Sequence, residues 1–220
     1  MQRFFDIIFS ASALFFLFPV FLTTIIILKF TGEGEIFFKQ NRVGKDGDIF
    51  GLFKFATMLK NSPNIGTGTV TTNNDPRILP LGKFLRATKI NELPQLINII
   101  NGDMSLVGPR PLTEEVFSNY NKNIQDIILS VRPGLSGIGS IIFRNEENIL
   151  NDDSLDYYNN VLLPYKGILE KWYVKKKNLY IYFSVIILTI SIVIFPKFNI
   201  IRKIFPDLPK IPSELEDKLN

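Results

Sequence analysis

The sequence predicts an α+β protein dominated by helices, with lipid as part of its surroundings. Three observations support this class. Two long uncharged apolar runs lie near the two ends of the chain, and 46% of the 220 residues are hydrophobic, including 20 Phe. A single Asp-Gly turn between two short apolar arms predicts a small β-hairpin. Elsewhere in the middle of the chain, apolar residues recur at helical spacing. We therefore expect a membrane-embedded N-terminal helix, a β-hairpin, amphipathic or interfacial helices and a C-terminal apolar helix.

The chain divides into four parts on this basis. Residues 1–30 form the first membrane segment, 31–178 the polar body, 179–196 a second membrane or interfacial helix, and 197–220 a short tail. The body carries nearly all the charge, and its length corresponds to one domain.

The first apolar run extends from Ile7 to Leu28, 22 residues without a charge. As a helix it would be about 33 Å long, enough to cross a bilayer core of about 30 Å. Pro19 lies in its middle and predicts a kink near residues 16–18, because proline removes a helical hydrogen bond. The run is too long for a signal peptide. Basic residues flank both ends, so the residues alone leave a spanning helix and a re-entrant hairpin equally open.

The sequence of the polar body predicts a succession of short secondary-structure elements. Residues 36–55 form the hairpin, and the composition of residues 60–76 predicts a loop. Helical spacing returns from 78 to 100, with a break at Pro80 and a restart at Pro94. We expect residues 101–111 to be irregular. Further helices are expected over 113–131 and 153–176.

The second apolar run, Leu179 to Pro196, has 18 residues and follows three consecutive lysines. This length is at the lower limit for a membrane-spanning helix. The lysines could anchor the segment to an anionic membrane surface. The alternative is a helix buried in the core of the body.

Composition excludes several kinds of site. The chain has no Cys and no His, which excludes thiolate nucleophiles, Cys/His zinc sites and imidazole general bases. The net charge of +4 is spread along the chain, without the basic stripe and stacking aromatics of nucleic-acid binders. A membrane surface or a small anionic substrate explains the positive charge better than a nucleic acid does.

The densest group of polar residues within apolar surroundings is Thr88 to Gln95. Pro94 belongs in the first turn of a helix, so Asn91 and Glu92 lie at or just before its N-terminus. Such an end favours a phosphate or an ionised carboxylate. The simpler alternative is that Asn91 caps the helix and Glu92 is an ordinary first-turn acid.

Arg110 lies between Pro109 and Pro111, and the two prolines fix the backbone that presents its guanidinium. A planar group with five donors suits bidentate phosphate binding. Asp75 and Asp103 are more typical of turns than of metal sites. Other cations near turn residues could join Arg110 in neutralising a diphosphate, although each alone is more often a surface charge: Lys54, Arg77, Arg86, Arg132 and Arg144.

Several motifs, in order and spacing, resemble the bacterial sugar transferase family, the monotopic polyprenyl-phosphate phosphoglycosyl transferases. The block from Gly102 to Pro111 (GDMSLVGPRP) is the most specific of them. The resemblance runs from the N-terminal apolar segment to about Tyr173. Its other motifs are Phe38–Gly44, Lys54–Phe55, Asp75–Arg77, Gly82–Arg86, Glu92–Leu96 and Arg132–Gly137.

The resemblance implies a re-entrant helix kinked at Pro19, embedded from the cytoplasmic side of the bacterial inner membrane. It implies Mg²⁺ and transfer of a phosphosugar from a UDP-sugar to undecaprenyl phosphate, with release of UMP, as the first step of exopolysaccharide, O-antigen or other lipid-linked glycan synthesis. Downstream glycosyltransferases are then possible partners. Glu92 carries over as a catalytic residue that helps hold the metal, and Gln95, Arg110 and Arg132 are also in place.

One departure concerns the family's catalytic Asp, because the matching residue here is Asn91. An amide is a feeble nucleophile beside a carboxylate. Three outcomes stay open: Glu92 is the nucleophile, the lipid phosphate attacks directly while Asn91 orients it, or the chain is inactive. Ala56 replaces an arginine, Gly139-Ser140 replaces Ala-Gln, and Glu170 replaces an Asp. We expect a divergent active transferase, with a non-catalytic membrane scaffold or regulator as the alternative. Two apolar segments are too few for a transporter.

Overall fold

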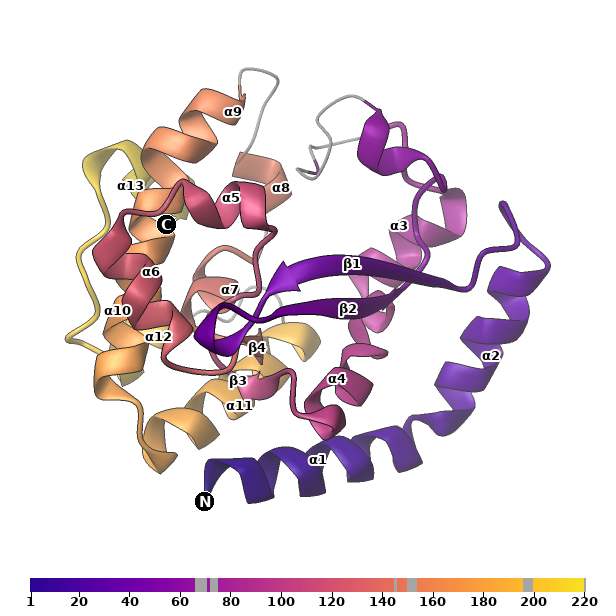
Figure 1. The fold of residues 1–220 in the computed structure, drawn as a ribbon, viewed down its shortest axis with the longest axis horizontal. Coiled ribbons are helices and arrows are strands. Elements are labelled where there is room, and N and C mark those ends of the chain that lie inside the picture. Colours follow the sequence, from indigo (N-terminus) through magenta and orange to yellow (C-terminus); the bar gives the residue numbers. More distant parts are fainter. Residues whose placement is uncertain (66–70, 72–74, 145, 150–153, 196–199, 220) are drawn as a thin grey trace.

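The computed structural model describes residues 1–65, 71, 75–144, 146–149, 154–195 and 200–219. It is helix-dominated with two small sheets, which confirms the predicted α+β class. In Figure 1, helices α1 (Gln2–Phe16) and α2 (Phe18–Lys29) form a bent arm along the bottom and right of the molecule. The hairpin crosses the middle, and the C-terminal helices gather on the left.

The bent arm confirms the kink predicted from Pro19. The axes of α1 and α2 differ by 61°, and the break falls at Leu17. Pro19 lies in the first turn of α2, where the missing N–H costs no helical hydrogen bond. Among the described helices, none alone is long and apolar enough to cross a membrane, whereas the bent pair meets the criterion of length and composition together.

The predicted hairpin consists of β1 (Phe37–Val43) and β2 (Ile49–Phe55). The strands are antiparallel, from the pair Phe37–Phe55 to the pair Val43–Ile49. The turn requires left-handed backbone at Asp46 (φ 58°) and Gly47 (φ 88°), which Asp and Gly tolerate better than other residues. The Asp-Gly signal therefore identified the turn correctly.

A second sheet was not predicted. Residues 105–107 form β3 (Ser105–Val107), which pairs in parallel with β4 (Gly134–Ser136), so the expectation that 101–111 is wholly irregular was wrong. The two segments pack so closely that a Cβ on Gly134 would lie 2.1 Å from the Gly108 nitrogen. Three-residue strands are too short to show a hydrophobic period.

Two helix boundaries also differ from those predicted. Pro80 begins helix α3 (Pro80–Ala87) instead of interrupting a helix, and α4 spans Gln95–Asn101. The single helix expected over 113–131 is two helices, α5 (Glu114–Ser118) and α6 (Lys122–Leu129). The Asn121 side chain accepts a hydrogen bond from the Ile124 N–H and so caps α6. A second cap inside the apolar pattern is what divides the helix.

The C-terminal part forms most of the core. Helices α7 (Ile138–Ile142), α8 (Glu146–Ile149) and α9 (Ser154–Tyr157) precede a π-helical turn at Tyr158–Leu162 and the long helix α10 (Leu163–Lys176). Helix α11 (Leu179–Ile194) buries one face, including Tyr182, Val185 and Leu188, and exposes the other. The tail forms α12 (Ile201–Ile204) and α13 (Ser213–Leu219), and its Leu215 is fully buried.

Candidate active site

A cavity of ≈ 750 Å³ lies between the hairpin, the 90–93 turn, α1, α7 and α11. One end is lined by charged and polar groups from distant parts of the chain. The other end is mainly apolar and is lined by Phe9 and Ala13 of α1 and by Ile186 and Ile190 of α11. The polar end brings together Arg42, Lys54, Arg86, Lys89, Asn91, Glu92, Arg110, Glu146, Tyr158 and Lys166.

A second cavity, of ≈ 270 Å³, lies between the end of the hairpin and the segment that follows it. Phe38, Gln40, Thr57 and Ser62 are among its lining residues. It shares part of its wall with the larger cavity, because Arg42, Lys54, Arg86 and Asn91 line both. The shared residues form one boundary between two differently lined spaces.

Asn91 lies on this boundary and does not cap a helix. It is in a 3₁₀ turn, Ile90–Glu92, that follows the left-handed residue Lys89, and α4 begins only after Pro94. The side chain is 5% exposed, and its Oδ1 has no hydrogen-bond partner within the described structure. Burying a polar atom without a partner is costly. The capping alternative from the sequence therefore fails, and the amide oxygen is available to a ligand.

Glu92 and Arg110 form an ion pair at the polar end, with 3.6 Å between Glu92 Oε1 and Arg110 Nη2. Burial opposes ionisation of Glu92, but the positive charges of Arg110, Lys54 and Lys89 outweigh it and lower its pKa. Burial also lowers the pKa of Lys54, to about 7, although Glu92 favours the charged form. Glu92 is thus an ionised carboxylate at neutral pH, surrounded by cations.

The backbone around Arg110 is held from two sides. The Arg110 N–H donates to Glu170 Oε1 at 3.4 Å, and Arg42 Nη1 donates to the Pro111 carbonyl at 3.2 Å. Glu170 is 3% exposed, and burial raises its pKa to about 7. The guanidinium of Arg110 therefore extends into the cavity from a fixed main chain.

Of the residues at the polar end of the larger cavity, four were not singled out from the sequence: Arg42, Glu146, Tyr158 and Lys166. Arg42 belongs to the motif Phe38–Gly44, which was a usable signal. The Lys166 ammonium pairs with Glu146 and lies 5.3 Å from the centre of the Tyr158 ring. No local pattern relates these three residues, because they come from α8, the π-helical turn and α10.

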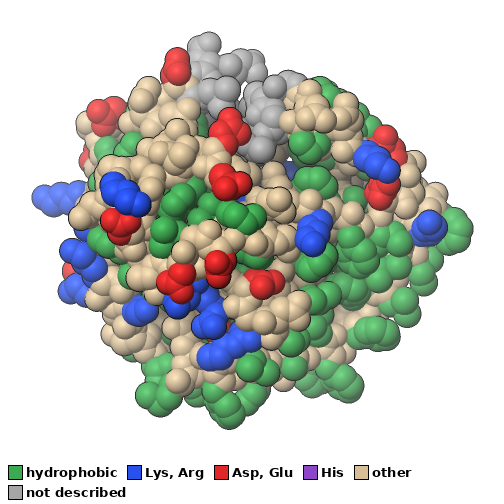
Figure 2. All heavy atoms as spheres, viewed as in Figure 1, with side chains coloured by type: hydrophobic (Ala, Val, Ile, Leu, Met, Phe, Trp, Pro, Cys, Tyr) green, Lys and Arg blue, Asp and Glu red, His purple; other side chains and the backbone are tan. Residues whose placement is uncertain are grey.

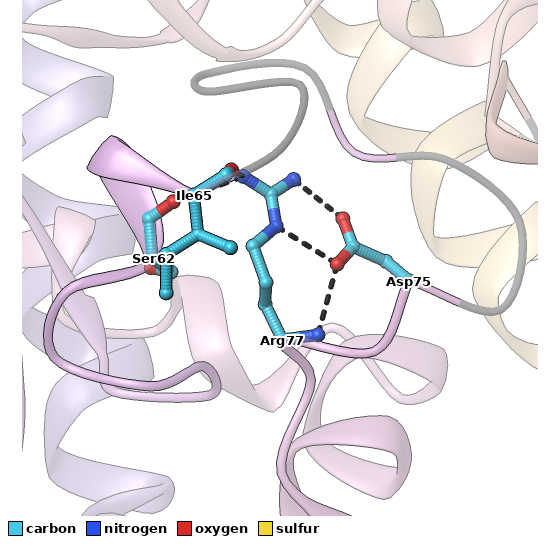
Figure 3. A network of polar contacts seen from close by, with 4 residues as sticks. All are labelled: Ser62, Ile65, Asp75 and Arg77. Atoms are coloured by element: carbon cyan, nitrogen blue, oxygen red, sulfur yellow. Dashed lines mark hydrogen bonds and ion pairs between the residues drawn. The ribbon is translucent and has the colours of Figure 1, made fainter.

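Several predicted site residues lie outside both cavities. Figure 3 shows Arg77 bound through two nitrogens to the Asp75 carboxylate, and it also donates to the Ser62 and Ile65 carbonyls. Arg132 Nε donates to the Gly102 carbonyl at 2.7 Å. The contacts of Arg77 and Arg132 hold loops together. Gln95 is buried in α4. Arg144 does line the larger cavity, where it donates to the Ile192 carbonyl.

The donors around Asn91 and Glu92 fit a magnesium ion only in part. The described residues contain no group of three or more acidic side chains that could hold a metal by themselves. Mg²⁺ commonly takes one or two protein oxygens and completes its shell with substrate phosphates and water. The Glu92 carboxylate and the unpartnered Asn91 amide oxygen can supply that number. Asp103 is not a candidate, since it lines neither cavity.

Comparison with known proteins identifies one family and several relatives that the chain resembles. A model of a family described as bacterial sugar transferase matches residues 1–196. The chain is 36% identical over 159 residues to the exopolysaccharide production protein ExoY of Sinorhizobium fredii, covering 66% of this chain and 70% of that protein. It is 30% identical over 209 residues to the undecaprenyl-phosphate galactose phosphotransferase of Salmonella typhimurium, covering 88% and 40% respectively.

A third relative is the UDP-glucose:undecaprenyl-phosphate glucose-1-phosphate transferase of Escherichia coli. It is 36% identical over 143 residues, which are 64% of this chain and 31% of that protein. The chain thus spans less than half the length of the Salmonella and Escherichia relatives.

Proposed function

Because the chain belongs to the bacterial sugar transferase family, we propose that it transfers a phosphosugar from a UDP-sugar to undecaprenyl phosphate and releases UMP. The observation that carries this proposal is the larger cavity. Its cation-rich end lies next to Asn91 and Glu92, and its apolar end lies between α1 and α11. A substrate with a phosphate on one end and an isoprenoid chain on the other requires these two environments in one continuous space. The names of the relatives supply the same pair of substrates.

The cations provide the electrostatic part of catalysis. Arg42, Lys54 and Arg110 can neutralise the diphosphate of the donor and the charge that gathers on the departing UMP. Fixed charges in a site shielded from water act more strongly than they do in solution. We include Mg²⁺ in the proposal, held by Glu92 and the Asn91 amide oxygen together with substrate oxygens. When bound, it would stabilise negative charge on the phosphates.

Asn91 leaves two chemical routes for an active enzyme. In direct displacement, an oxygen of the lipid phosphate forms a bond to the sugar-bearing phosphorus. The bond from that phosphorus to the bridging oxygen breaks, and UMP leaves with the electron pair. In the covalent route, a Glu92 oxygen forms the first bond to that phosphorus as the same bridging bond breaks and UMP leaves, and an oxygen of the lipid phosphate then displaces the carboxylate. The ion pair with Arg110 keeps Glu92 ionised, and a buried amide with a free oxygen is suited to orienting a substrate.

The departures from the family pattern surround the cavities, which favours an active, altered site. Asn91 and Ala56 line the smaller cavity, and Ser140 lines the larger one. Gly139 leaves room for Glu170, since a Cβ there would lie 2.6 Å from Glu170 Oε1. The cations meanwhile remain in place. The alternative, a non-catalytic scaffold that binds the nucleotide sugar, rests on Asn91 and Ala56.

The distribution of apolar side chains supports a membrane location for the bent arm. The outward sides of α1, α2 and α11 expose many large apolar residues, and Figure 2 shows them gathered along the bottom and right of the molecule. Charged side chains lie mainly elsewhere on this face. We propose that the arm enters the bacterial inner membrane from the cytoplasmic side and returns to it. The apolar mouth of the larger cavity would then face lipid.

The proposal is tested by measuring UMP release from a panel of UDP-sugars, with and without Mg²⁺ and undecaprenyl phosphate. We expect release from at least one donor when all components are present, and its loss on removal of Mg²⁺. Glu92→Gln should lower the rate by roughly 100-fold or more, since it removes a charge that acts on the reacting groups. The matched control is Glu114→Gln, which changes an exposed acid outside the cavities and should be neutral.

The two routes give different results when the lipid is left out. UMP release or a phosphosugar adduct on the protein without acceptor indicates the covalent route through Glu92. Strict dependence on acceptor indicates direct displacement. Binding of UDP-sugar by calorimetry without turnover across the whole panel would exclude transfer and establish the scaffold.

A further inference from the structure

We infer that the two cavities are separate subsites: the smaller holds the nucleoside of the donor, and the larger holds the sugar and the isoprenoid acceptor. This inference rests on the proposed function and concerns how the two substrates share the site. The phosphates of both would meet at the shared boundary, where Arg42, Lys54 and Asn91 line both cavities.

The smaller cavity has the lining that a nucleoside requires. Alternate residues of a strand lie on one face of the sheet, so Phe38, Gln40 and Arg42 of β1 face the same way. Lys54 pairs with Phe38 across the hairpin. The half-buried Phe38 ring offers a surface for stacking, and Thr57 and the Gln40 amide nitrogen offer hydrogen-bonding groups, while Gln40 Oε1 accepts from Arg42. A few polar groups beside an aromatic surface are typical of small-molecule sites.

The larger cavity is unsuited to a nucleoside at its far end. There the wall includes Phe9 and Ala13 of α1, Leu135, and Ile186 and Val193 of α11. The polar groups nearby are engaged with the protein, since the Ser136 and Thr189 hydroxyls bond to each other and Arg144 donates to the Ile192 carbonyl. An isoprenoid chain fits such a wall, since burying apolar surface is favourable and needs no polar partner. The same two helices expose apolar side chains on their outer sides. The apolar end of the cavity and the exposed apolar surface therefore belong to the same two helices.

The boundary between the cavities determines where the reacting groups lie. A diphosphate at Arg42 and Lys54 with its nucleoside in the smaller cavity must extend its sugar into the polar end of the larger one. Glu146, Tyr158 and Lys166 line that end. The acceptor phosphate approaches the same boundary from the apolar end. Both substrates can thus bind at once, and the donor does not have to leave before the lipid enters.

The absence of cysteine from the chain permits a direct test. Single cysteines are placed in the smaller cavity (Met58→Cys), in the larger cavity (Ile186→Cys) and at an exposed position just after α6 as a control (Ser130→Cys). The full chain in detergent is treated with a maleimide, and labelling is followed by mass spectrometry. UMP with Mg²⁺, undecaprenyl phosphate, and both together are the added ligands.

We expect UMP at about ten times its Kd to slow labelling in the Met58→Cys variant about tenfold. It should leave the Ile186→Cys variant unchanged. Undecaprenyl phosphate should give the reverse pattern, and the Ser130→Cys variant should respond to neither. Both ligands together should protect both cavity positions. If a variant does not fold, Leu59→Cys and Val193→Cys provide second positions in the respective cavities.

Failure of this inference differs from failure of the proposed function. UMP protection of Ile186→Cys, or no protection of Met58→Cys in a chain that turns over, would overturn the subsite assignment and leave the activity intact. The expected protection pattern without turnover would overturn the activity and leave the assignment intact. Absence of both protection and turnover would overturn the subsite assignment and the activity together.

Discussion

Glu170 illustrates, at the scale of one residue, how a buried carboxyl group outside the cavities can position a residue within them. It holds the Arg110 main chain through Oε1, while its Oε2 has no hydrogen-bond partner in the described structure. Burial raises its pKa to about 7, so the group is largely protonated below neutral pH. Arg110 in turn pairs with Glu92. The protonation of Glu170 is therefore coupled to the stability of the fold around the site.

The sign of this coupling gives the first prediction. The pKa of Glu170 is raised from 4.5 to about 7 in the folded protein, so its contribution to stability is fully present below about pH 4.5. It is lost as the pH rises to about 7. The free energy of unfolding of the native chain relative to Glu170→Gln should fall by roughly 3 kcal/mol across this window and level off above it. Denaturant titrations at a series of pH values measure this difference, and a flat difference would contradict the assignment.

A second prediction concerns Gly139, which faces the same carboxyl group. A Cβ at this position would lie 2.6 Å from Glu170 Oε1, so Gly139→Ala should displace the carboxyl group from the Arg110 N–H. We expect a loss of roughly 1–3 kcal/mol in stability and a lower kcat/KM. Glu170→Asp in the same chain should restore part of both, because the shorter side chain vacates the space. A double-mutant cycle measures the coupling, and strictly additive effects would show that the two positions are independent.

Single residues also show what the sequence could and could not predict about the site. Asn91, Glu92, Lys54 and Arg110 were placed in one site from motifs, and all four line the larger cavity. Arg77 was grouped with them as a cation near a turn, but it is bound to Asp75 two residues away. The contact between Lys166 and Glu146 depends on how α10 packs against α8. No spacing within the chain encodes that approach.

At the scale of elements, α1 is attached to the body by polar contacts along one side. Arg3 Nη2 donates to the Ile100 carbonyl at 2.8 Å, at the C-terminal end of α4. Asp6 is 2% exposed and accepts hydrogen bonds from Ser105 Oγ, the Leu106 N–H and the Tyr182 hydroxyl, at 2.9, 3.0 and 2.9 Å. One carboxylate thus joins α1, β3 and α11. These contacts fix the helix that forms one wall of the larger cavity.

The third prediction follows from this attachment. Asp6→Ala removes the acceptor of the Ser105 hydroxyl, the Tyr182 hydroxyl and the Leu106 N–H. A buried donor that is left without an acceptor destabilises the fold. We expect the free energy of unfolding to fall by roughly 3 kcal/mol or more, with weaker binding of undecaprenyl phosphate because the cavity wall loosens. Thermal unfolding in detergent and lipid-binding measurements check both effects. Asp48→Ala, which removes an exposed carboxylate from ordinary extended backbone, is the control, and an equal effect of the two would contradict the role of Asp6.

The elements themselves were predictable where one residue type determines the backbone. Pro19 located the bend, and Asp46-Gly47 located the hairpin turn. The second sheet was not predictable, because its two strands lie about thirty positions apart and each has only three residues. Helix α11 was placed correctly, but its division into a buried and an exposed face depends on the core built by α10 and the tail.

At the scale of the whole molecule, the apolar surface and the opening of the larger cavity involve the same elements. Helices α1 and α11 line the apolar end of the cavity, and together with α2 they carry the exposed apolar side chains. A bend of 61° separates α1, of 15 residues, from α2, of 12 residues. At about 22 and 18 Å, each helix is too short to cross a bilayer core of about 30 Å by itself. The sequence left a spanning helix and a hairpin equally open, because a proline predicts a kink but not its angle.

The last prediction separates these two arrangements in the membrane. Because the chain has no cysteine, single cysteines can be placed after Met1, at Thr31 beyond the bent arm, and at Ser118 on the exposed side of α5. A re-entrant arm returns its end to the face from which it entered. All three positions should then react with an impermeant maleimide in inverted vesicles, and none in intact cells. Labelling of the N-terminal cysteine from the opposite side to Thr31→Cys and Ser118→Cys would mean that the arm spans the bilayer. In that case α1 would leave the wall of the larger cavity, and its apolar end could no longer hold the lipid as proposed.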